Sequence, residues 1–227
     1  MADNRSFNFR PNQPFSGKPV TIEEAEMHFL AKLNDPNENH KAVRLELVRI
    51  YRLMGKVADA MSFATEYLEE TNDLEEKAEA YFTLGQAMEH NDDFETAVRF
   101  YMLALELEPR NKFHAYFIRN NIGFSMNHLN RHIEAEKYLR EAIAIDTSHA
   151  NAHKNLGLSL EGQQRYGEAA RSFIAAVQAN ASDPRALWHL EELTERHPET
   201  FAEILDLSYQ TNMCRKAVEF AAQRKMN

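Results

Sequence analysis

The chain has 227 residues, of which 44% are hydrophobic and 27% are charged, and its formal net charge is −9. This apolar content suits one large or two small globular units and excludes a wholly disordered chain. The acidic balance disfavours a broad phosphate-binding surface, so nucleic acid is not expected as a partner.

Features of targeting and redox chemistry are scarce. The single cysteine, Cys214, has no second cysteine for an internal disulfide. The N-terminus lacks the apolar core of a signal peptide, and no run of about 18 apolar residues is present. We therefore expect a cytoplasmic protein that does not insert into membranes, and we expect no cofactor.

The first forty residues divide into two predicted segments. Residues 1–20 are rich in Asn and Pro and predict a flexible N-terminal arm, in which Phe7, Phe9 and Phe15 leave open a docking role. Residues 21–40 predict an N-terminal helix over about 22–33. It begins at a capping box, in which Thr21 and Glu24 satisfy each other's backbone N–H groups.

Residues 41–74 predict a degenerate helical hairpin. Val48 stands at the position where later hairpins have a small residue, Gly55 lies in the turn, and Ala60 matches the first alanine of the later units.

Three later units each repeat a small residue at fixed spacing. The glycine is followed after 12 residues by one alanine and after 7 more by another. The three sets are Gly85, Ala97 and Ala104; Gly123, Ala135 and Ala142; and Gly157, Ala169 and Ala176. Each unit reads as two short helices with a polar turn between them. We predict that the small residues let the paired helices approach closely, which offsets the cost of about 1 kcal/mol of a helical glycine.

These units resemble the tetratricopeptide repeat, whose 34-residue pattern is W-x2-L-G-x2-Y, then A-x3-F, then P. The match is best at Tyr81-x2-Leu84-Gly85, Ala97-x3-Tyr101 and Pro109. The register gives repeats at 78–111, 116–149 and 150–183. Arg119 departs from the pattern in the second repeat, and His153 in the third. The fold class implied is all-α, a right-handed α-solenoid, or superhelix, of stacked helical hairpins.

Residues 184–227 predict a C-terminal degenerate repeat with capping helices. A helix begins near Pro184 in register, but Glu191 replaces the small residue. After Pro198 we expect two helices, at about 199–210 and 213–225, with Ala217 and Ala221 in a final degenerate unit. Terminal units of a solenoid close off its apolar interior and commonly depart from the consensus.

The resemblance implies a concave groove lined by the first helix of each repeat, where a peptide binds. The groove-facing positions of each repeat are the second, fifth, sixth, ninth, twelfth and thirteenth. From these we predict the peptide-binding residues Phe82, Gln86, Phe117, Asn120, Asn121, Phe124, Asn127, Asn151, Lys154, Asn155, Arg185, Trp188 and His189. This surface is rich in amides, each of which offers a donor and an acceptor to a peptide backbone.

Two of these amides, Asn121 and Asn155, occupy the same place in successive repeats. In similar superhelices, such as the one that precedes the catalytic domain of O-linked N-acetylglucosamine transferase, asparagine there forms a ladder along an extended peptide. The alternative is that these asparagines are solvated on exposed helix faces. Trp188 either anchors a ligand or packs in the C-terminal cap.

Other chemistries find little support. The lysine and asparagine set with which chaperone adaptors of this repeat class grip a C-terminal carboxylate does not assemble, because Leu158 follows Lys154 where asparagine is needed. His128 and His132 have the spacing of a helical metal site, but a turn separates them and no third ligand is evident. No phosphate loop or nucleophile elbow occurs, so we expect no metal site and no enzymatic activity.

The leading hypothesis is a non-enzymatic adaptor that binds an extended segment of a protein or peptide partner in the groove. The runner-up is a self-associating scaffold, and hence a homo-oligomer, in which the degenerate caps or the basic tail at 215–227 dock on an acidic convex face of another copy. A third is an export chaperone that resembles those of type III secretion.

Overall fold

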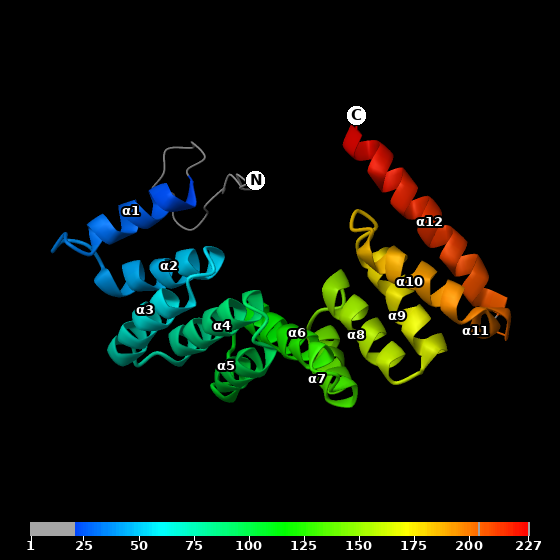
Figure 1. Cartoon of the computed structure of the whole chain (residues 1–227), viewed down its shortest axis with the longest axis horizontal. Helices are drawn as coiled ribbons and strands as arrows, with labels where there is room; N and C mark the ends of the chain where they lie inside the picture. Colours follow the sequence, from blue (N-terminus) through cyan, green and yellow to red (C-terminus); the bar gives the residue numbers. More distant parts are fainter. Residues whose placement is uncertain (1–20, 204, 227) are drawn as a thin grey trace. The chain divides into compact units, whose positions relative to one another are not determined.

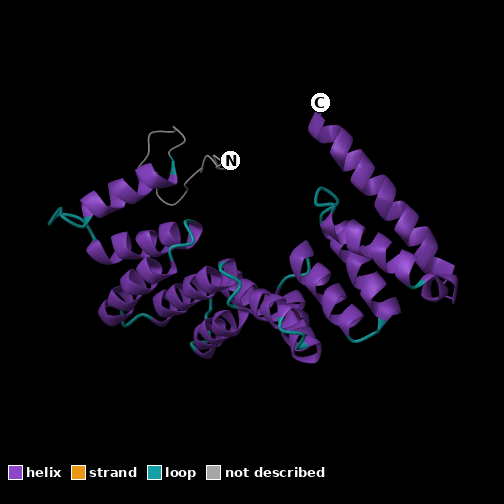
Figure 2. Ribbon diagram, viewed as in Figure 1, coloured by secondary structure: helices purple, strands orange, loops and turns teal. Residues whose placement is uncertain are grey.

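The computed structural model describes residues 21–203 and 205–226, and the predicted arm at 1–20 lies outside the described residues. Within those ranges the chain forms helices joined by short loops, and contains no strand (Figure 2). The predicted class, an all-α solenoid of stacked helical hairpins, is confirmed. The chain divides into two compact units between Leu107 and Glu108.

The first unit contains one leading helix and two hairpins (Figure 1). Its helices are α1 (Ile22–Lys32), α2 (His40–Leu53), α3 (Val57–Glu70), α4 (Leu74–His90) and α5 (Phe94–Glu106). Helix α1 packs on α2, α2 pairs with α3, and α4 pairs with α5 while also contacting α2 and α3. The predicted capping box is confirmed, since Thr21 and Glu24 exchange side-chain to backbone hydrogen bonds at the start of α1.

The second unit contains two hairpins followed by three further helices (Figure 1). Its helices are α6 (Lys112–His128), α7 (His132–Ile145), α8 (Ala150–Gly162), α9 (Tyr166–Ala179), α10 (Arg185–Arg196), α11 (Pro198–Glu203) and α12 (Leu205–Met226). Helix α6 pairs with α7 and α8 with α9, and α8 also packs on α6 and α7. Helices α10 and α12 both pack on α9.

The turn inside each hairpin has one conformation. Gly55, Asp92, Asn130 and Gln164 all have positive φ angles, of 69°, 60°, 57° and 63°. Each is the fifteenth residue of its predicted repeat. The next residue donates its backbone N–H to a carbonyl five residues back, as in Arg131 to Met126 at 2.9 Å, which is the bond that closes a Schellman motif. The hairpin containing Gly55 shares this turn with the regular repeats.

The predicted close approach of paired helices occurs at the three glycines. A Cβ atom placed on Gly85 would lie 2.4 Å from the ring of Tyr101. On Gly123 it would lie 2.4 Å from Leu139, and on Gly157 it would lie 2.4 Å from the ring of Phe173. The alanines of each set are fully buried. The large side chain of the second helix therefore fills the space that glycine leaves on the first.

The C-terminal segment differs from its prediction. In place of helices at 199–210 and 213–225, a short α11 precedes one continuous α12. Leu207, Thr211 and Cys214 are buried along one side of α12. This buried side continues through residues 210–213, where the break between two helices was predicted. Ala217 is exposed and does not form the predicted small-residue contact of a final repeat.

We predict that Gly157→Ala destabilises the chain by about 1–3 kcal/mol, because the added methyl group overlaps the ring of Phe173. Urea denaturation followed by circular dichroism measures this. Alanine is the better helix former by about 1 kcal/mol, so an uncrowded site would give the opposite sign. In a Phe173→Ala background, the same substitution should become neutral or stabilising, and a persistent loss there would contradict the contact.

Candidate binding groove

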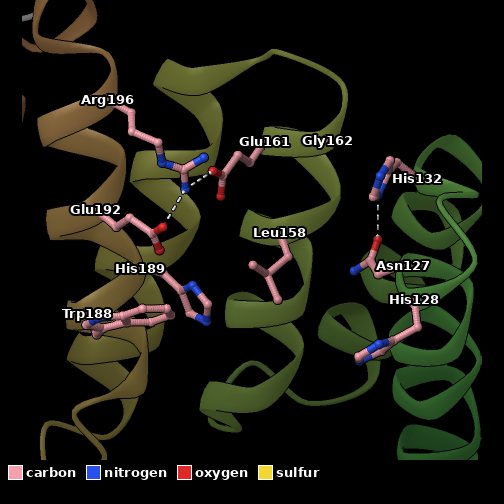
Figure 3. A pocket seen from close by; sticks show the side chains of 10 residues that line it. All are labelled: Asn127, His128, His132, Leu158, Glu161, Gly162, Trp188, His189, Glu192 and Arg196. Carbon is pink, nitrogen blue, oxygen red and sulfur yellow. Dashed lines mark hydrogen bonds and ion pairs between the residues drawn. The ribbon is translucent and has the colours of Figure 1, made fainter. Parts of the chain in front are cut away.

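The site is the face shared by the first helices of the second unit, α6, α8 and α10. Ten residues of α6, α7, α8 and α10 line a hollow of about 460 Å³ on this face (Figure 3). They are Asn127, His128, His132, Leu158, Glu161, Gly162, Trp188, His189, Glu192 and Arg196. We call this hollow the α8 groove, because Leu158 of α8 lies at its centre, between the side chains of α10 and those of α6 and α7.

One wall of the α8 groove, formed by α10, is aromatic and charged (Figure 3). Trp188, the only tryptophan in the sequence, is 59% exposed. The ring of His189 lies 4.7 Å from that of Trp188 and stacks at 5.4 Å on the buried Phe173. Trp188 therefore faces solvent rather than packing in the C-terminal cap.

An ion-pair network closes one end of the α8 groove. The guanidinium of Arg196 lies 2.7 Å from a carboxylate oxygen of Glu161 and 3.4 Å from one of Glu192 (Figure 3). The three groups carry a net charge of −1. The network links α8 to α10, and it places polar groups next to the apolar surface of Trp188 and Leu158.

The opposite wall is held by hydrogen bonds around Asn127. Its Oδ1 accepts from the Ser159 hydroxyl at 2.9 Å and lies 3.2 Å from Nδ1 of His132. Its Nδ2 donates to the backbone carbonyl of Asn155 at 2.8 Å. Asn127 thus uses both ends of its amide to fix α6 and α7 against α8.

The three asparagines expected to face a ligand are buried instead. Asn120, Asn121 and Asn155 are 5%, 9% and 3% exposed. Asn155 Nδ2 donates to Asn120 Oδ1 at 3.1 Å, and Asn120 Nδ2 donates to Asn121 Oδ1 at 3.0 Å. This corrects the expectation that they are surface residues, because α6 and α8 pack closely enough for their amides to bond to each other.

The other predicted groove residues are spread over both units. Phe82 and Gln86 lie on α4 of the first unit, where Phe82 is buried. Within the second unit, Asn127, Trp188 and His189 line the α8 groove, whereas the remaining residues lie outside that lining. Of these, Phe117, Phe124 and Lys154 are half-buried, and Asn151 and Arg185 are exposed.

Sequence reasoning missed His132 as a groove residue, together with Glu161, Gly162, Glu192 and Arg196. Glu161 and Gly162 are the twelfth and thirteenth residues of their repeat, and Glu192 and Arg196 are the ninth and thirteenth of theirs. Those are positions already counted as groove-facing, so the repeat register contains the signal that identifies them.

Two basic side chains, His189 in the α8 groove and Lys154 one turn before Leu158 on α8, have lowered pKa values. Partial burial is the main cause for Lys154, followed by the nearby charge of Arg185. Burial also lowers the pKa of His189, and the charge of Lys154 lowers it further. His189 is therefore held in its neutral form more strongly than an exposed histidine.

Among the described residues, no group of three Asp, Glu, His or Cys side chains is placed to bind a metal ion. The described helices also include none with both the length and the apolar character needed to cross a bilayer.

Comparison with known proteins identifies the repeat. Residues 78–111 match the model of the tetratricopeptide repeat. The chain is 30% identical over 98 residues to protein O-mannosyl-transferase Tmtc3 of Drosophila melanogaster, covering 43% of this chain and 10% of that protein. It is 30% identical over 114 residues to the peroxisomal targeting signal receptor of Kluyveromyces lactis, covering 50% of this chain and 19% of the receptor. The chain thus spans only a small part of these curated relatives.

Two solved structures show the same fold. BtubC (BKLC) from P. vanneervenii superposes with a TM-score of 0.65 at 17% identity, covering 87% of this chain and 89% of that one. MamA 41-end from Desulfovibrio magneticus RS-1 superposes with a TM-score of 0.60 at 19% identity, covering 76% of this chain and 97% of that one.

We predict that Asn155→Ala lowers the free energy of unfolding by about 1–3 kcal/mol, because it removes a bond between α8 and α6 and leaves Asn120 Oδ1 without its donor. Asn151→Ala is the matched control, since Asn151 lies one turn earlier on α8 and is exposed; it should change stability by less than about 0.5 kcal/mol. Equal effects of the two substitutions in urea denaturation would contradict the structural role of the buried amides.

We also predict a pH dependence from His189. Its folded pKa lies below the unfolded value of about 6.5, so the unfolded chain binds more protons as the pH falls through that range, and stability drops. Thermal melts between about pH 7 and pH 5 should therefore show a larger loss for the wild type than for His189→Gln. Parallel pH curves for the two proteins would exclude this contribution.

Proposed function

We propose that the chain, whose residues 78–111 match the tetratricopeptide repeat, is an adaptor that binds an extended segment of a partner protein in the α8 groove. Repeats of this family imply a protein–protein interaction module and typically act without catalysis. The observation that supports the site is the exposed Trp188, which lies with Leu158 in a hollow on the face shared by successive first helices.

The chemistry of the α8 groove suits a peptide with an apolar side chain. Trp188 and Leu158 offer apolar surface, and burying that surface against an apolar side chain of the peptide favours binding. Beside that surface lie Glu161, Glu192 and Arg196. Their charged groups can form hydrogen bonds with the backbone or polar side chains of the peptide. Such a combination of a few polar groups around an apolar centre is typical of binding sites.

The buried asparagines receive a different role from the predicted ladder. Asn120, Asn121 and Asn155 bond to one another, so we propose that they fix the spacing of α6 and α8 and thereby the shape of the α8 groove. Asn155 Oδ1 is buried and has no hydrogen-bond partner in the described residues. An unsatisfied buried acceptor costs about 1–3 kcal/mol, which offsets part of the stability that the two amide hydrogen bonds contribute.

Self-association, the other function predicted from the sequence, is supported by a different surface, on α12. Export-chaperone activity and the cytoplasmic location remain predictions from the sequence.

The single tryptophan provides a direct test. Peptides selected from a displayed random library against the full chain are titrated into the protein while Trp188 fluorescence is recorded. We expect a saturable change in emission, and a loss of at least about tenfold in affinity for Trp188→Ala by calorimetry, equal to about 1.4 kcal/mol.

Ile133→Ala is the matched control, because Ile133 is 76% exposed on α7 and does not line the α8 groove. Selected peptides that bind equally to wild type and Trp188→Ala, without a change in emission, would place binding elsewhere and contradict the proposal.

A further inference from the structure

Helix α12 carries an apolar stripe that faces away from the core. Tyr209, Met213, Ala217 and Phe220 are spaced by four, four and three residues, which places them on one side of a helix. Tyr209 is 66% exposed, Met213 47% and Phe220 61%. The side of α12 that packs on the core is formed instead by Leu207, Thr211 and Cys214, which are buried. We call the four exposed residues the α12 stripe.

Opposite charges flank the two ends of the α12 stripe. Asp206 lies in the first turn of α12 and Arg224 in the last. Their separation of 18 residues equals about five turns at 3.6 residues per turn, so both lie on the side of the stripe. The Arg224 guanidinium lies 5.6 Å from the ring centre of Phe220, over its face, and Asp206 bonds to Gln210 on the adjacent turn.

The α12 stripe and its flanking charges are complementary to those of a second copy of α12 that runs in the opposite direction. If a second α12 lies antiparallel with its midpoint near Arg215, Asp206 of each copy faces Arg224 of the other. Met213 then faces the small Ala217 of the other copy, and Tyr209 lies beside its Phe220. A parallel pairing would instead bring Asp206 to Asp206 and Arg224 to Arg224, which is repulsive.

A hollow beside the α12 stripe offers space for a side chain of the second copy. Its volume is about 380 Å³, and its lining includes Val177 and Gln178 of α9 together with Met213 and Ala217. Because Ala217 faces Met213 of the other copy, the unbranched methionine side chain can enter this hollow. Lys216 lies at the edge of the stripe, where its ammonium group remains in water.

We propose that α12 is the interface of a symmetric homodimer, in which two copies pair antiparallel through the α12 stripe. The interface is isologous, so each contact occurs twice. A single helix pair buries little surface compared with the 1,200–2,000 Å², roughly, of a standard stable interface. We therefore expect a dissociation constant in the micromolar range. This surface is separate from the α8 groove, so the proposal does not depend on peptide binding.

Charge reversal tests both the interface and its direction. Sedimentation equilibrium of the full chain over about 1–500 µM should show a monomer–dimer equilibrium. Asp206→Arg and Arg224→Asp, each alone, place two pairs of like charges in the dimer and should weaken it at least tenfold. An equimolar mixture of the two variants should dimerise with about the wild-type constant, because both charge pairs in the mixed dimer are then opposite.

Two further variants test the apolar contact. Met213→Glu should abolish dimerisation, whereas Ile133→Glu, at a more exposed apolar residue on α7, should leave it unchanged; circular dichroism checks that both retain their helices. The proposal is overturned if the wild type stays monomeric throughout, if Met213→Glu dimerises normally, or if mixing the two charge variants restores nothing.

Discussion

The close approach of paired helices at Gly85, Gly123 and Gly157 is the contact on which each hairpin depends. At each glycine the partner helix inserts a large side chain into the space that a Cβ would occupy, and buried alanines continue the contact. Because this packing occupies one side of the first helix, its other side remains available for different contacts. In the second unit those other sides, on α6, α8 and α10, contribute most of the lining of the α8 groove.

Polar contacts between α6 and α8 then decide the form of the α8 groove. Asn127 and the bonded pair of Asn120 and Asn155 connect the two helices through side chains whose geometry is restrictive, whereas apolar packing alone tolerates small sliding movements. We therefore propose that the buried amides hold the helices in place, and that the apolar and charged residues around them, above all Trp188, contact the ligand.

The sequence predicted the repeated part of this structure well, because its signals are local. The glycine and alanine spacing indicated the hairpins, and Thr21 with Glu24 indicated where α1 begins. What escaped prediction depends on neighbours in space. Asn155 was predicted to face a bound peptide, because the repeat pattern does not reveal its hydrogen bond to Asn120 on another helix. Helix α12 was predicted as two helices, because no local pattern reveals its contacts with α9 and α10. Arg196 was missed although its repeat position was known.

The proposed binding mode places an extended segment of a partner protein along the face shared by α6, α8 and α10. Hydrogen–deuterium exchange of the full chain, with and without a saturating selected peptide, tests it most directly. Binding in the α8 groove should slow exchange in α8 and α10 around Leu158 and Trp188 and leave exchange in α7 and α9 unchanged. Protection confined to α7, α9 or α12 would contradict it, because the partner would then bind a surface that the repeat geometry does not prepare.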